Sequence, residues 1–147
     1  MNPVDSDEPF VSVLKEQPLR LKEAYSRLIA AGPLPINSVA VTTAILSRLR
    51  AYFLAQREIK QFLNKIYSGA ASDFFVETVL FYMRALAETH KLGVEVMSER
   101  KFTTPHGPLR PDISLWKGAR VLALVECKIT QANLLADIER GPIPMFD

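Results

Sequence analysis

The stretch that most constrains the fold runs from Pro111 to Lys128 and reads PDISLWKGARVLALVECK. It predicts two strands, residues 113–116 and 120–129, separated by a Lys-Gly pair of the kind found in the turn of a β-hairpin. Residues 121–125 carry no polar side chain, so we expect the second strand to be covered on both faces of its sheet. The stretch therefore predicts a hairpin of two strands in the second half of the chain.

Charged residues stand at one end of this hairpin. Side chains two apart in a strand share a face, so Glu126 and Lys128 are expected on one side and Cys127 on the other. Asp112 begins the neighbouring strand and comes within a few ångströms of Glu126 if the strands pair. Two such carboxylates repel unless a cation lies between them, and Mg²⁺ and Mn²⁺ prefer oxygen ligands. The alternative is a plain salt bridge at the rim of a buried hairpin.

This pattern resembles the PD-(D/E)xK nuclease superfamily, which has the restriction-endonuclease-like fold. The matching residues are Pro111-Asp112 and Glu126-Cys127-Lys128. The resemblance implies that Asp112 and Glu126 bind a catalytic Mg²⁺ or Mn²⁺, and that Lys128 orients or activates the attacking water. Such a metal polarises a phosphoryl oxygen and lowers the pKa of bound water, while a lysine ammonium stabilises the developing phosphate charge. The implied activity is hydrolysis of DNA phosphodiester bonds.

A third acidic residue precedes the hairpin. Residues 72–91 form a strongly apolar segment that predicts a helix packed against a sheet. Within its apolar first half lies Glu77, which needs a partner if it is buried. In the superfamily, a helix before the first core strand often carries an acidic residue that reaches the metal, and Glu77 is the best match. The alternative is a partly exposed glutamate paired with Arg84 or a lysine.

The predicted fold class is α/β, of the α+β kind. We expect residues 71–147 to form a restriction-endonuclease-like core, a small mixed sheet flanked by helices. In this core residues 94–102 are a strand, 103–110 a loop and 130–140 a helix. The superfamily adds one more strand after that helix, but only seven residues follow it here, two of them proline, so we expect that strand to be missing. An open sheet edge would favour a homodimer.

Residues 1–70 are expected to be a helical N-terminal extension. Pro18 is placed to open a helix over residues 19–31, which Gly32 ends. Residues 39–67 contain neither glycine nor proline and predict one long amphipathic helix.

Positive charge is concentrated in two segments. Residues 37–70 carry five basic and one acidic side chains, net +4, and residues 99–130 carry six basic and three acidic, net +3. Every other segment is net negative, so one side of the molecule suits a phosphate backbone. An ordinary solvated helix face is the alternative for the helical part. The candidate nucleic-acid contacts are Arg50, Arg57, Lys60, Arg110 and Gln131.

The composition of the chain narrows the classes of protein that remain possible. The sequence has no apolar run of eighteen residues, so no membrane partner is expected, and its acidic, polar first residues are unlike a signal peptide. A single cysteine gives no internal disulfide and no zinc cluster. A cytoplasmic location is therefore expected, and the resemblance to the nuclease superfamily implies a DNA-directed enzyme. Two other classes stay open: a catalytically inactive nuclease-like binding or regulatory module, and a helical protein-interaction module.

Overall fold

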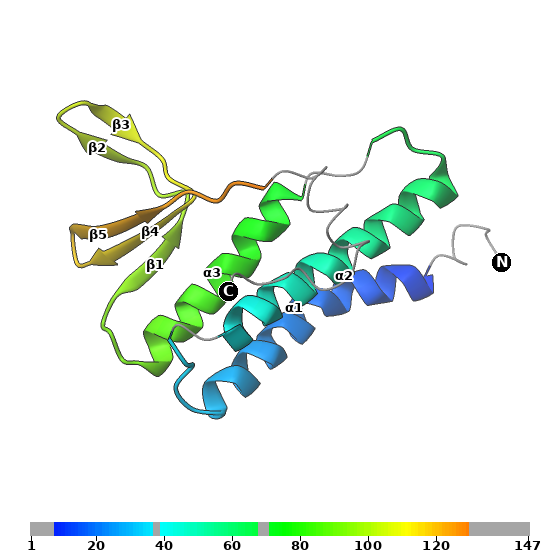
Figure 1. Ribbon diagram of the computed structural model, residues 1–147, viewed down its shortest axis with the longest axis horizontal. Helices are drawn as coiled ribbons and strands as arrows, with labels where there is room; N and C mark the ends of the chain where they lie inside the picture. The colour runs from blue at the N-terminus through cyan, green and yellow to red at the C-terminus, as the bar shows by residue number, and fades with distance from the viewer. Residues whose placement is uncertain (1–7, 37–38, 68–70, 130–147) are drawn as a thin grey trace.

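The chain is an α+β protein in which three helices precede five strands (Figure 1). The computed structural model describes residues 8–36, 39–67 and 71–129. Helices α1 and α2 both pack on α3, and α3 packs on β1. None of the helices in these ranges is long and apolar enough to cross a membrane. The elements are α1 (Glu8–Ala30), α2 (Val39–Leu63), α3 (Ser72–Thr89), β1 (Glu95–Ser98), β2 (Phe102–Thr104), β3 (Gly107–Leu109), β4 (Ile113–Lys117) and β5 (Arg120–Val125).

Helix α1 begins ten residues before the proline that was expected to open it. Pro18 lies inside the helix, where it removes one backbone hydrogen bond and crowds the preceding turn. The prediction of a helix start at this proline was therefore wrong. The predicted end of this helix is close to the observed one, because α1 ends at Ala30. Gly32 adopts φ +100°, a conformation that glycine adopts readily.

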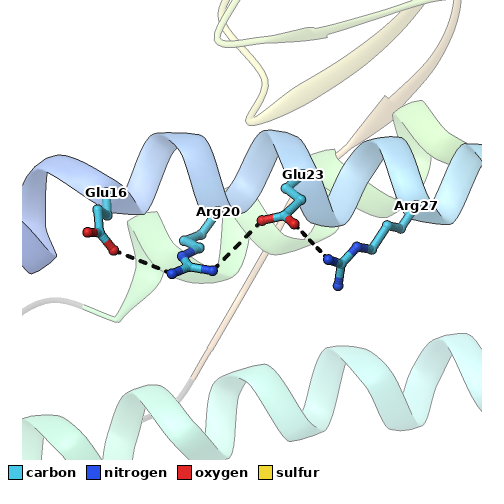
Figure 2. Close-up of polar contacts among 4 residues, drawn as sticks. All are labelled: Glu16, Arg20, Glu23 and Arg27. Atoms are coloured by element: carbon cyan, nitrogen blue, oxygen red, sulfur yellow. Dashed lines mark hydrogen bonds and ion pairs between the residues drawn. The ribbon is translucent and has the colours of Figure 1, made fainter.

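A chain of ion pairs runs along the exposed side of α1 (Figure 2). Arg20 lies 3.5 Å from Glu16 and 3.9 Å from Glu23, and Arg27 lies 2.6 Å from Glu23. The residues are three or four apart, the spacing at which side chains of a helix are neighbours. Such exposed pairs stabilise a helix by about 0.3–0.5 kcal/mol each, which offsets part of the cost of the internal proline.

The helical core lies between α2 and the start of α3. Leu49 and Phe53 of α2 are each 3% exposed and pack with Ala71. Tyr52 stacks on Phe74 of α3 with ring centroids 4.4 Å apart. Helix α2 ends at residue 63 instead of continuing to 67 as predicted, because the last part of the predicted stripe has nothing to pack on and is exposed in the described structure.

The main sheet has the order β1-β4-β5, and both pairings are antiparallel. Its central strand β4 carries the buried side chains of Ile113, Ser114 and Trp116. The expected mixed sheet is thus wrong for the described residues, where β2 and β3 also pair antiparallel. The predicted helix over residues 130–140 and the question of a further strand lie outside the described ranges.

Strand β5 differs from its prediction in length and in cover. It ends at Val125 instead of residue 129, because its partner β4 is preceded by Pro111, which has no N–H to extend the ladder. Leu122 and Leu124 are each 47% exposed, so the expectation of cover on both faces is wrong within the described chain. An apolar run is typical of an interior strand, but β5 lies at the edge of the described sheet.

Residues 103–110 form most of a second hairpin where we expected a loop. The predicted strand over residues 94–102 is divided at Glu99, which has φ +54°, so that β1 ends before it and β2 begins after it. The β2–β3 hairpin contains Pro105 and Pro108, and its strands pair from Phe102 with Leu109. A two-stranded ribbon consists of two edges, where proline is tolerated.

Candidate functional site

Asp112 joins the ends of three strands. Its carboxylate Oδ2 accepts the backbone N–H of Cys127 at 2.7 Å, and its backbone carbonyl accepts the N–H of Glu99 at 3.1 Å. Cys127 follows β5, Glu99 follows β1, and Asp112 itself precedes β4 after the buried Pro111. The proline ends the backbone ladder here, and the aspartate side chain holds β5's continuation in place.

A cavity of about 370 Å³ opens beside this joint. Four carboxylate residues contribute to its walls: Asp73 and Glu77 from α3, Glu99 after β1, and Asp112 before β4. Glu77 is exposed, so it needs no buried partner. The structure thus brings two of the three predicted metal ligands, Glu77 and Asp112, to one cavity.

Glu126 and Lys128 lie just past β5, next to this cavity but not on its walls. The Lys128 ammonium is 3.8 Å from Glu126 Oε2, and their side chains are 88% and 57% exposed. This ion pair agrees with the expectation that the two side chains share a side, while Cys127 between them lines the cavity. Exposed pairs of this kind are weak, so both groups remain accessible to a ligand.

The pKa of the Cys127 thiol depends on the negative charges around it. Its pKa is raised, first by burial and then by the charges of Asp112 and Glu126. Both factors disfavour a thiolate. Cys127 is therefore suited to packing rather than to nucleophilic chemistry.

The residues of the cavity suit a hard cation by chemistry. All four acidic side chains offer carboxylate oxygens, the ligands that Mg²⁺ and Mn²⁺ prefer. Within the described ranges, however, no three side chains of histidine, cysteine, aspartate or glutamate are gathered closely enough to hold a metal ion. The carboxylates surround the cavity without converging, so binding would require them to draw together.

The candidate nucleic-acid contacts of the described chain come from two separate parts of the fold. Arg50, Arg57 and Lys60 lie on α2, which packs on α3 and stands apart from the sheet (Figure 1). Arg110 is beside the site, with its guanidinium 4.0 Å from Glu99. Gln131 lies outside the described residues.

Two cavity carboxylates were missed from the sequence. Asp73 is four residues before Glu77 and so shares its helix face, a signal that the sequence did contain. Glu99 carried no such signal, because its position depends on how β1 pairs with β4.

The site is thus a carboxylate-lined cavity at the joint of three strands, with a lysine beside it. Comparisons of the chain with protein-family models, with curated proteins and with solved structures found no match.

Proposed function

We propose that the chain is a metal-dependent nuclease of the PD-(D/E)xK type that hydrolyses DNA phosphodiester bonds. The observation that carries the proposal is that Glu77 of α3 and Asp112 before β4 line the same cavity. The order α3, β1, β4, β5 supports it, because the superfamily core begins with a helix followed by three strands. In this interpretation the β2–β3 hairpin is an insertion between the first two core strands.

In the proposed site, Asp112, Glu126 and Glu77 hold Mg²⁺ or Mn²⁺. When bound, the ion would supply a Lewis acid for a phosphoryl oxygen and a water of lowered pKa. The N–H of Cys127 orients the Asp112 carboxylate, and a carboxylate has further lone pairs for a ligand. Lys128 is mostly exposed and weakly paired, so its ammonium is free to bind the phosphate.

Cleavage of plasmid and of labelled single-stranded DNA tests this proposal. Reactions contain Mg²⁺, Mn²⁺ or EDTA and compare wild type with Lys128→Ala. The matched control is Lys117→Ala, which removes an exposed lysine at the far end of the β4–β5 hairpin. We expect cutting that needs the metal, is lost in Lys128→Ala and survives in Lys117→Ala. Equal activity in wild type and Lys128→Ala would contradict the proposal.

A catalytically inactive nuclease-like binding or regulatory module is the second candidate. It is favoured by the open arrangement of the carboxylates in the described chain and by the ion pair that Glu126 makes with Lys128. DNA binding by folded wild type without any cleavage in Mg²⁺ or Mn²⁺ would select this candidate.

A helical protein-interaction module is the third candidate. Apolar and aromatic side chains at and beyond the end of α2 are exposed, namely Phe62, Ile66 and Tyr67. Mg²⁺ binding that disappears in Asp112→Ala would count against this candidate, because a helical module has no use for a metal at the sheet.

A further inference from the structure

Residues 100–111 form a basic arm that leaves the sheet beside the candidate site. The arm reads RKFTTPHGPLRP, with three lysine or arginine residues, one histidine and no acidic residue. Its base is closed by the hydrogen bond from the Glu99 N–H to the Asp112 carbonyl. Strands β2 and β3 of the arm stand at the end of the molecule away from α1 and α2 (Figure 1).

The inner face of the basic arm is fixed to the sheet through Trp116. The Phe102 ring meets the Trp116 ring edge-on at 5.3 Å, and the Arg100 guanidinium lies 3.9 Å from its centroid. Trp116 is itself buried, and its Nε1–H donates to Ser114 Oγ at 2.7 Å. A cation over an indole face and an edge-on aromatic pair are both favourable contacts. The arm is therefore held in position before any partner arrives.

The outer face of the basic arm presents its remaining basic side chains to solvent. Because side chains alternate along a strand, Lys101 and Thr103 share this face with Pro108 and Arg110, and all four are exposed. Lys101 and Arg110 flank the last pair of the ribbon, Phe102 with Leu109, at the base of the arm. The outer face thus carries two exposed positive charges, which suit an anionic partner.

The outer face also lies next to the cavity. The Arg110 guanidinium is 4.0 Å from the Glu99 carboxylate, and both side chains are 65% exposed. Glu99 lines the cavity with Asp112. An ion pair this exposed contributes little, so Arg110 can exchange its partner for a phosphate at the mouth of the cavity.

We propose that the outer face of the basic arm binds the sugar-phosphate backbone of duplex DNA and so positions the strand at the cavity. This inference rests on the proposed function. A two-stranded ribbon fits the major groove, about 12 Å wide. Strands β2 and β3 have three residues each and span roughly 10 Å, a length of duplex that carries about six phosphate charges. The contacts are to the backbone and carry no base readout.

Binding of a fluorescent duplex, measured by anisotropy in EDTA over a range of salt concentrations, tests this inference without cleavage. The arm variant is Lys101→Ala with Arg110→Ala. The matched control is Lys117→Ala with Arg120→Ala, an exposed pair directly opposite each other at the end of the β4–β5 hairpin. We expect the slope of log K against log salt to fall by about 1.8 in the arm variant, because each phosphate that is no longer neutralised accounts for about 0.9. Affinity at low salt should fall roughly tenfold or more.

The control should keep the wild-type slope and stay within about twofold of its affinity. A further variant, Thr103→Glu, places a negative charge on the outer face and should also weaken binding. Far-ultraviolet circular dichroism and melting confirm that each variant is folded.

Equal losses in arm and control variants, or no loss in the arm variant, overturn the inference. So does a wild type that fails to bind duplex at low salt. Binding that depends on the arm in a protein that never cleaves supports the inference and contradicts only the proposed nuclease activity.

Discussion

The carboxylate of Asp112 accepts the backbone N–H of Cys127 at 2.7 Å, fifteen residues further along the chain. The bond lies where Pro111 has ended the backbone ladder between β4 and the continuation of β5. A residue proposed to bind metal is therefore also a structural joint. Any loss of function on mutating Asp112 has two causes, which different substitutions can separate.

Measurements of stability separate the structural role of Asp112 from its proposed role in metal binding. Asp112→Ala removes the acceptor of a half-buried N–H and should lower the free energy of unfolding by about 1–2 kcal/mol. Asp112→Asn keeps a carbonyl oxygen and should lose less than half of that. Glu77→Ala, an exposed site on the same cavity, should change it by less than about 0.5 kcal/mol. Urea denaturation measures all three, and an equal loss in the alanine and asparagine variants of Asp112 would refute the role of this bond.

The reactivity of the single cysteine reports the charge at the same joint. Asp112 is one of the causes that raise the pKa of the Cys127 thiol. Asp112→Asn should lower that pKa and speed alkylation at pH 8, although burial, the larger cause, keeps the thiol slower than a free cysteine. The rate of iodoacetamide labelling as a function of pH measures the shift. Asp73→Asn, another cavity residue, is the control and should leave the profile in place.

Metal affinity tests the role of Glu77 without any DNA. If Glu77 is a ligand, Glu77→Gln should weaken Mn²⁺ or Mg²⁺ binding at least about tenfold, which corresponds to about 1.4 kcal/mol. Glu95→Gln, an exposed carboxylate of β1 away from this cavity, should leave binding unchanged. Isothermal titration calorimetry measures both. The same affinity in the two variants would remove Glu77 from the site.

Tyr25, which is partly buried and donates a hydrogen bond to Glu88, should make the free energy of unfolding fall at alkaline pH. Burial, and then the bond at 2.6 Å and the charge of Glu88, raise the pKa of Tyr25 to about 12. Because the folded state holds this proton more tightly than the unfolded state, the stabilisation is complete below pH 10 and is lost as pH rises towards 12.

Urea midpoints between pH 9.5 and 12 test this dependence. Tyr25→Phe should have a flatter profile in this window than wild type. Tyr67→Phe, which alters an exposed tyrosine, is the control and should follow wild type. Parallel profiles for Tyr25→Phe and wild type would contradict the assignment.

The helical core predicts very different losses of stability when two phenylalanines are replaced by alanine. Phe53 of α2 is 3% exposed and packs with Leu49 and Ala71, whereas Phe62, nine residues later, is 85% exposed. Phe53→Ala should lower the free energy of unfolding by about 3–5 kcal/mol because it leaves a cavity. Phe62→Ala should cost less than about 0.5 kcal/mol. Thermal and chemical denaturation compare them, and similar losses would place the core elsewhere.

The sequence predicted those parts of the fold that depend on local pattern. The turn after Lys117 was expected from its lysine-glycine pair, and Gly118 indeed has φ +59° between β4 and β5. The long helices followed from their three- and four-residue apolar spacing. Errors arose where local rules compete: Pro18 lies within a helix, and Pro105 and Pro108 lie within a hairpin.

The site was predictable only as far as its residues are neighbours in the chain. Glu126 and Lys128 are two apart and their side chains meet, as alternation along an extended chain requires. The approach of Glu77 to Asp112 could be expected only through the resemblance to a nuclease core. The contribution of Glu99 and the exposure of Leu122 depend on strand pairing and on which strand lies at the edge, which no local pattern encodes.

Trp116 is the single tryptophan of the chain, and it contacts Arg100 and Phe102 at the base of the basic arm. The protein thus contains its own optical reporter, placed where the arm meets the sheet. Movement of Arg100 off the indole changes the field at the ring, and with it the intensity and colour of its emission. Events at the arm can therefore be followed in real time, in unlabelled protein, by stopped-flow fluorescence.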